Sequence, residues 1–163
     1  MIFVVLGTQK FQCNRLLKEI DRLVEMRLIK EQVFAQQGYS DYVPKYYCSV
    51  NFLDKEEFEN KIAECSLVIA HSGVGTILTA INHNKPVIVF PRLQKYKEHV
   101  DDHQIGIASV FHKKHLVLMC NEGDNLSDLI ERSKSFQFRT YTSQRERVIE
   151  LIKIYLREGA GNV

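Results

Sequence analysis

The stretch HSGVGT at residues 71–76 combines two glycines with three side chains that can donate hydrogen bonds. A short apolar run at 67–70 precedes it, and apolar residues at helical spacing follow it, so a strand, a glycine turn and a helix are predicted in that order. The first amides of a helix have no partner within the helix, and glycines let an anion approach the backbone closely. This turn could therefore bind a phosphate through His71, Ser72, Gly73, Val74, Gly75 and Thr76.

A glycine turn by itself is weak evidence, because such glycines often serve only to pack a helix closely against a strand. A second observation supports the binding interpretation. Residues 2–6 form an apolar run typical of a central parallel strand, and Gly7, Thr8 and Gln9 follow it directly. The carboxyl ends of parallel strands meet at one edge of the sheet, so two anion-binding loops are expected there, which suits a diphosphate.

A third loop leads to the same edge. Asn84 and Pro86 end the helix after the glycine turn, residues 87–90 are the next predicted strand, and the loop from Pro91 to His103 follows. Either Asp101 or Asp102 is expected to cap the helix that begins there. The residues of this loop that we expect to face the ligand are Arg92, Asp102, His103 and Gln104, and the Gln104 amide could bind a ribose hydroxyl or a phosphate oxygen.

No metal or cofactor is expected. His112 and His115 are three residues apart, but we find no third ligand at a suitable spacing near them, and the chain has no Asp-x-Asp motif. Helix N-termini and basic side chains can neutralise a diphosphate without a metal ion.

The other predicted elements complete an alternation of strands and helices. A first helix is expected over about 14–27 with Asn14 as its cap, a capping box begins the helix after Asp54, and a last strand is expected at 116–119. Helices at 126–133 and 144–158 follow. The fold class is therefore α/β, a doubly wound, Rossmann-like parallel sheet.

Composition limits the possible functions. The 163 residues carry a net charge of +2, with 45% hydrophobic and 26% charged residues, which predicts one globular domain over 1–163 and gives no support for nucleic-acid binding. No apolar run has the roughly 20 residues that span a bilayer, and no basic leader precedes the first strand, so a cytoplasmic location is expected. The four cysteines form no CxxC pair, which favours reduced thiols.

The sequence resembles a known family in three places: GTQ after the first strand, HSGVGTILTAINHNKPVIVFPR in the middle, and EHVDDHQ after it. These motifs are similar to the C-terminal, donor-binding half of GT-B glycosyltransferases of the family 28 type. Within that family the chain resembles stand-alone catalytic subunits of capsule and exopolysaccharide synthesis and of the dolichol pathway.

The resemblance implies that a UDP-sugar lies against the three loops described above. Where related sequences carry a glutamate that holds the ribose hydroxyls, this chain has Thr79, which is the corresponding candidate position. No catalytic base is assigned.

The resemblance also implies half of an inverting GT-B enzyme, with a membrane-associated partner that holds a lipid-diphosphate-linked acceptor and recruits the chain to the inner face of the membrane. The transferred sugar would be a hexose, with galactose as one candidate, in bacterial exopolysaccharide or capsule synthesis. The broad apolar stripe of the 144–158 helix is the predicted docking surface. Two alternatives remain open: a UDP-sugar epimerase or hydrolase, and a non-catalytic accessory subunit of a transferase.

Overall fold

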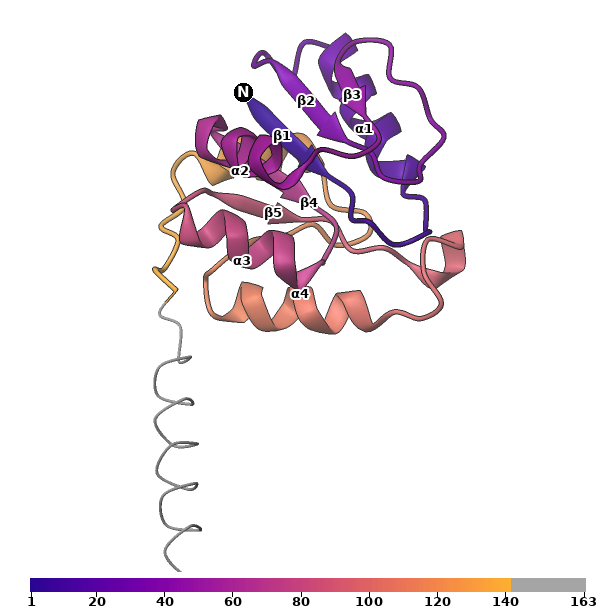
Figure 1. The fold of residues 1–163 in the computed structure, drawn as a ribbon. Helices are drawn as coiled ribbons and strands as arrows, with labels where there is room; N and C mark the ends of the chain where they lie inside the picture. The colour runs from indigo at the N-terminus through magenta and orange to yellow at the C-terminus, as the bar shows by residue number, and fades with distance from the viewer. Residues whose placement is uncertain (142–163) are drawn as a thin grey trace, which may run out of the picture.

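A computed structural model describes residues 1–141 of the chain. Its centre is a six-stranded parallel sheet with the strand order β3-β2-β1-β4-β5-β6 (Figure 1). The strands are β1 (Ile2–Val5), β2 (Val33–Gln36), β3 (Cys48–Val50), β4 (Leu67–Ala70), β5 (Val87–Val89) and β6 (Leu118–Met119). This is the Rossmann order, and it confirms the predicted doubly wound α/β fold.

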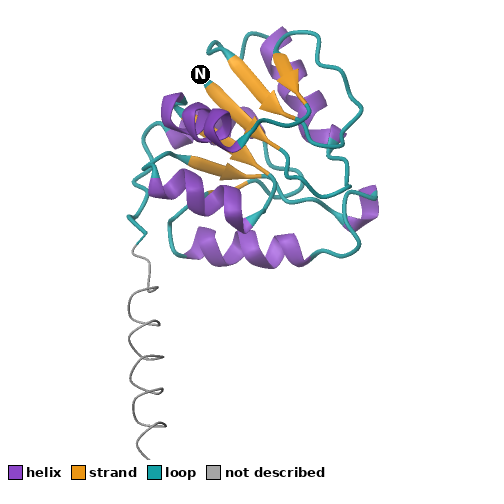
Figure 2. Ribbon diagram, in the orientation of Figure 1, coloured by secondary structure: helices purple, strands orange, loops and turns teal. Residues whose placement is uncertain are grey.

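Helices cover both faces of the sheet (Figure 2). One apolar core lies under α1 (Asn14–Glu25) and α5 (Leu126–Ser133), and the other lies under α2 (Lys55–Glu64), α3 (Val74–Asn82) and α4 (His103–Lys113). Alternate residues of β1 supply the two cores, since Ile2 and Val4 belong to the first and Phe3 and Val5 to the second. Burial on both sides explains why β1 and β4 have continuous apolar sequences.

The chain reverses its winding direction between β1 and β4. These strands are neighbours in the sheet, although 61 residues lie between the end of β1 at Val5 and the start of β4 at Leu67. From β1 the chain winds outward to β2 and β3, then crosses back to β4 and continues to β5 and β6. In open sheets of this kind the loops on either side of such a reversal diverge and leave a crevice at the carboxyl ends of the strands. The loops after β1 and β4 therefore border that crevice.

Several predicted boundaries are confirmed by local interactions. Asp54 and Glu57 form the expected capping box at the start of α2. Asn84, which follows the end of α3, adopts the left-handed conformation with φ of 54°, as the sequence predicted for the residue that closes this helix. The short helix predicted at 126–133 is α5.

Other boundaries were predicted wrongly. Asn14 does not cap the first helix: Cys13 holds the N-cap position, and the Asn14 amide instead donates to the Asp41 carboxylate at 2.7 Å. That helix ends at Glu25, because Arg27 is left-handed with φ of 57°. The last strand covers only Leu118–Met119 of the predicted 116–119, since a turn with His115 at φ of 59° directly precedes that segment.

The predicted helix at 144–158, with its proposed docking stripe, lies outside the described residues. Among residues 1–141, no helix combines the length and the apolar character that crossing a bilayer requires.

Candidate functional site

A cavity of about 510 Å³ opens at the carboxyl edge of the sheet, between the loops after β1 and β4 and the start of α4. Most of the residues predicted to bind the ligand line it: Gly7, Thr8, Gln9, His71, Ser72, Gly73, Val74, Gly75, Thr76, His103 and Gln104. Three loops that are far apart in the sequence thus meet around one space, at the edge that the strand order selects.

The His71 ring occupies the space between the backbones of two glycines. The Gly7 amide donates a hydrogen bond to His71 Nδ1 at 3.1 Å, which links the loop after β1 to the end of β4. A Cβ atom added at Gly7 would lie 2.5 Å from His71 Nε2, and one added at Gly73 would lie 2.6 Å from the same atom. Both positions therefore require glycine because the imidazole fills the space that a side chain would need.

Gly75 differs from these two glycines. A Cβ atom at Gly75 would have no protein atom within 4 Å, so the protein leaves the space beside this residue open. The alternative explanation of the glycine turn is close packing within the protein. It accounts for Gly73, where a side chain would overlap the His71 ring, but it gives no reason for Gly75. An approaching ligand would use that space.

The first turn of α3 carries backbone donors that the protein does not use. The N-cap residue, Gly73, has no side chain to accept from them, and the amides of Val74, Gly75 and Thr76 have no acceptor among the described residues. Ser72 Oγ is also buried without a hydrogen-bond partner in this part of the chain. An unsatisfied buried polar group costs about 1–3 kcal/mol, so the buried Ser72 hydroxyl, beside the open amides of the exposed residues Val74 and Gly75, points to a bound acceptor.

Two further helices begin at the same cavity, but their first turns are occupied. Asp54 accepts from the Glu57 amide at the start of α2 at 2.8 Å, and Asp101 accepts from the His103 amide at the start of α4 at 3.1 Å. Each helix N-terminus is equivalent to about half a positive charge. Since only α3 lacks a capping carboxylate, an anion is expected to bind at α3.

The structure modifies the predicted role of Gln104. Its side chain is buried, and its Oε1 accepts from the Arg92 amide at 3.1 Å, which fixes the side chain between the loop after β5 and α4. The carbonyl end is thus occupied, whereas Nε2 has no partner among residues 1–141, and Gln104 is one of the residues that line the cavity. This position can donate hydrogen bonds to a ligand.

Three predicted site residues do not line the cavity. Arg92 is fully buried, and its Nη2 donates to the Phe11 carbonyl at 2.9 Å. It therefore stabilises the loop after β1 instead of lining the cavity. Asp102 turns back to accept from the Gln94 amide at 2.8 Å. The Thr79 hydroxyl donates to the Gly75 carbonyl at 2.9 Å, one helical turn away from the open end of α3.

The cavity also has walls that the sequence analysis did not identify. Leu53, Asp54, Lys55 and Phe58 come from the start of α2, and Gln36 comes from the end of β2. Asp54 was recognised only as a helix cap. The strand order would have indicated these residues. Because α2 follows the parallel strand β3, it begins at the carboxyl edge of the sheet, where the other cavity loops lie.

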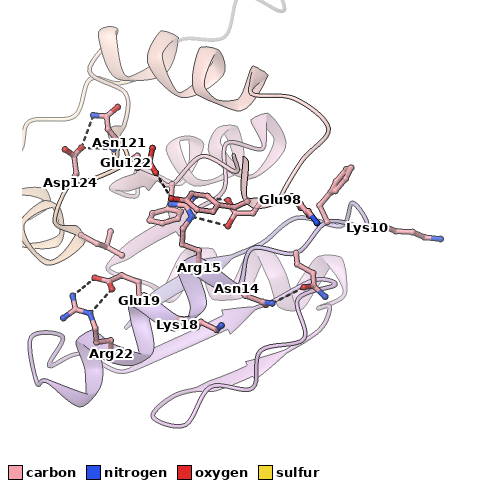
Figure 3. A pocket seen from close by; sticks show the side chains of 17 residues that line it. Lys10, Asn14, Arg15, Lys18, Glu19, Arg22, Glu98, Asn121, Glu122 and Asp124 are labelled. Atoms are coloured by element: carbon pink, nitrogen blue, oxygen red, sulfur yellow. Dashed lines mark hydrogen bonds and ion pairs between the residues drawn. The ribbon is translucent and has the colours of Figure 1, made fainter. Parts of the chain in front are cut away.

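A half-buried ion pair holds the loop that leads to His103 and Gln104 at the start of α4. Arg15 binds Glu98 with two hydrogen bonds, of 3.2 and 2.8 Å, and donates a third to the Pro91 carbonyl at 3.0 Å. Glu98 also accepts from the Leu93 amide at 3.0 Å. Figure 3 shows Arg15 of α1 turned toward Glu98 in a second, larger groove. The ion pair therefore fixes the path of the chain from β5 to α4.

That second groove, of about 1010 Å³, is less suited to a diphosphate. Its carboxylates include Glu19, Glu98, Glu122 and Asp124, and ion pairs with Arg22, Arg15 and Lys95 occupy the first three of them. Figure 3 shows these acidic side chains distributed along the groove. Lys10, Lys18 and Lys97 also line this groove and have no ion-pair partner among residues 1–141, so charge alone does not decide between the two sites. The groove lacks the glycine turn at 71–76 and its open α3 amides, so we place the candidate site in the smaller cavity.

Burial makes His71 a neutral residue at physiological pH. Desolvation and the positive charge of Arg92 lower the pKa of His71 from 6.5 to about 4. His71 Nδ1 lies 3.1 Å from the Gly7 amide nitrogen and 3.3 Å from the Val5 carbonyl oxygen, so it accepts from Gly7 when the ring proton is on Nε2 and donates to Val5 when that proton is on Nδ1. Burial also lowers the pKa of the Arg92 guanidinium from its usual value, but this group stays charged.

The fold is that of the Rossmann-like half of a GT-B glycosyltransferase. Among solved structures, the chain superposes on the glycosyltransferase SnogD from Streptomyces nogalater with a TM-score of 0.54 and 17% identity, covering 94% of this chain and 43% of that one. The Acinetobacter baumannii protein MurG gives 0.53 and 14%, over 81% and 40% of the two chains.

A family model identifies the chain more closely. Residues 1–153 match the glycosyltransferase family 28 C-terminal domain, so the chain belongs to that family. It is also 28% identical over 131 residues to the human UDP-N-acetylglucosamine transferase subunit ALG13. The aligned region covers 73% of this chain and 11% of the human protein. The chain thus spans a small part of that relative and less than half of the solved structures.

The close contacts of His71 predict different effects at the three glycines. Gly7→Ala and Gly73→Ala should each lower the free energy of unfolding by about 1–3 kcal/mol, because the new methyl group overlaps the imidazole. Gly75→Ala should change it by less than about 1 kcal/mol. Urea denaturation measures all three, and Gly7→Ala combined with His71→Ala should recover part of the loss. Equal effects at the three glycines would contradict this packing.

The depressed pKa of His71 predicts a specific loss of stability in mild acid. The unfolded chain takes up a proton at His71 near pH 6.5 and the folded chain only near pH 4, so stability present above pH 6.5 is lost as the pH falls between these values. Between pH 7.5 and 5 the loss from this residue should be about 2 kcal/mol. Urea denaturation of the wild type and of His71→Asn at both pH values isolates it. Parallel pH dependence in the two proteins would argue against a buried neutral ring.

Proposed function

We propose that this chain is the donor-binding, catalytic subunit of a UDP-sugar-dependent glycosyltransferase. The observation that supports this most is the uncapped first turn of α3, whose amides at Val74, Gly75 and Thr76 lie beside the unpartnered Ser72 hydroxyl. The diphosphate of a nucleotide sugar supplies acceptors for all of these donors.

The same donors would stabilise the products of the transfer reaction. When the bond between the sugar and the diphosphate breaks, negative charge develops on the departing UDP, and fixed donors that face this charge lower the barrier. The helix dipole of α3 acts in this way without a metal ion, and in the tautomer that accepts from the Gly7 amide His71 adds an Nε2 donor. The Gln104 Nε2 group is placed to bind the ribose or the phosphate from the opposite wall.

We further propose that a second subunit completes the enzyme. The chain covers only 34–43% of the solved glycosyltransferases that it resembles, and the human relative carries the word subunit in its name. The second subunit would be associated with the membrane and hold a lipid-diphosphate-linked saccharide at the cytoplasmic face. The reaction would be an inverting transfer of a hexose in exopolysaccharide or capsule synthesis, and the 144–158 segment remains the predicted docking element.

Gly75→Val should abolish most UDP binding without unfolding the protein. The valine side chain would fill the open space next to the α3 amides, so we expect the affinity for UDP to fall by at least about 100-fold, or about 2.7 kcal/mol, in isothermal titration calorimetry.

Gly106→Val is the matched control, because Gly106 is an equally open glycine in α4 that does not line the cavity. It should bind UDP like the wild type. If Gly75→Val retains full affinity, the diphosphate does not bind at α3 and the proposed function is wrong.

A turnover assay tests the need for a second subunit. The purified chain with UDP-hexose should release no UDP, whereas addition of membranes that contain the acceptor subunit and the lipid-linked acceptor should give transfer. Turnover by the isolated chain would favour an epimerase or hydrolase instead. A third outcome is sugar transfer by the complex although UDP binds at the α3 turn neither in the isolated chain nor in the complex. That outcome would favour a non-catalytic accessory role.

A further inference from the structure

We propose that His99, Asp101 and His103 form a binding site for a divalent transition-metal ion of the zinc type. The three residues lie at the start of α4 and just before it, and one ligand atom from each lies within 4.8 Å of the other two. Two imidazoles and one carboxylate are a common ligand set for zinc, cobalt and related ions, whereas magnesium prefers oxygen ligands. The proposal does not depend on the function proposed above.

The Asp101 carboxylate approaches both rings, which pack edge to face with their centroids 4.6 Å apart. Its Oδ1 is 3.4 Å from His99 Nδ1, which matches the separation of about 3.4 Å between two ligands of a tetrahedral zinc ion. The same oxygen contacts His103 Nδ1. The His103 side chain is about half exposed, so its ring has room to turn and take a ligand position of its own.

The surroundings of His99 favour metal binding at Nδ1. Its side chain is buried with 6% exposure, its ring packs against Phe11 at 4.7 Å between centroids, and its Nε2 donates to Gln9 Oε1 at 3.3 Å. This bond places the proton on Nε2 and leaves a lone pair on Nδ1. The lone pair faces the Asp101 carboxylate, with only a 3.5 Å contact from the Asp101 amide to satisfy it. A cation between these two acceptors would resolve their repulsion.

An amide oxygen that accepts from the far nitrogen of a ligating histidine is a common support of metal sites, because it fixes the ring and its tautomer. Gln9 would have this role here. Gln9 and His103 both line the cavity described above, so a bound ion would connect the loop after β1 with the start of α4. No step of the proposed sugar transfer passes through this ion.

The other histidines and cysteines of the chain determine which variant is suitable for a metal-binding test. His112 and His115 form a second histidine pair, but they are not part of any three-ligand cluster among the described residues. Cys48 is the exposed cysteine of that part of the chain, and residues 142–163 contain neither histidine nor cysteine. The test protein is therefore the untagged full chain with Cys48→Ser, without nucleotide.

Titration with Zn²⁺ by calorimetry should show one saturable site, and Co²⁺ should give a visible ligand-field absorption band that Zn²⁺ displaces. His99→Ala, Asp101→Asn or His103→Ala should each abolish the band. Gln9→Ala should lower the affinity about 10- to 100-fold, and His115→Ala should leave it unchanged. His103→Ala alters an exposed side chain, so it remains informative if the change at buried His99 impairs folding.

Three results would overturn the proposal: no saturable binding of either ion, binding that persists in His103→Ala and Asp101→Asn, or binding that His115→Ala removes. Because the readouts are metal affinity and the cobalt spectrum, they are separate from UDP binding and transfer. Absence of metal binding with UDP binding intact would overturn the metal site alone, and absence of UDP binding with metal binding intact would overturn the donor site alone.

Discussion

The contact between the His71 imidazole and the backbones of Gly7 and Gly73 determines the geometry of the whole edge of the sheet. The ring is buried, accepts from the Gly7 amide, and occupies the space that side chains at the two glycines would need. It therefore sets the distance between the loop after β1 and the loop after β4. The cavity and the orientation of the α3 amides both follow from that distance. Since a charged ring could not accept this bond, the arrangement also requires the low pKa of His71.

The third wall of the cavity depends on a separate set of interactions. The chain between β5 and α4 has little regular structure, and the Arg15–Glu98 pair, with its bonds to the Pro91 carbonyl and the Leu93 amide, holds it in place. Gln104 then joins this loop to α4 through the Arg92 amide. A residue of α1, on one face of the sheet, thus positions groups of a site that lies largely on the other side. The larger groove around Arg15 is the outer surface of this support.

Much of the fold was predictable because its signals are local. Continuous apolar runs gave the buried strands, the Asp54 capping box gave the start of α2, and Asn84 with Pro86 gave the end of α3. The cavity-lining loops were predictable because parallel strands bring their carboxyl ends to one edge. These inferences need only residue type and spacing.

The directions in which side chains point could not be obtained in this way. Arg92 lies in the loop after β5 and Gln104 lies twelve residues later at the start of α4, yet Gln104 lines the cavity and Arg92 turns to Phe11. That choice depends on long-range partners in the loop after β1. Likewise, the sequence did not show why each cavity glycine is needed: Gly7 and Gly73 accommodate His71, whereas Gly75, at the same cavity, leaves open space. The cluster of His99, Asp101 and His103 became recognisable only when the turn before α4 brought alternate residues together.

The central claim is that the first-turn amides of α3 bind the diphosphate of a nucleotide sugar. Backbone amide chemical shifts of the ¹⁵N-labelled protein, followed during titration with UDP, test it most directly. We predict that the largest changes occur at Val74, Gly75 and Thr76, with smaller ones at Gly7 and Gln104. Changes centred on the groove around Arg15, or no saturable changes at all, would contradict the claim.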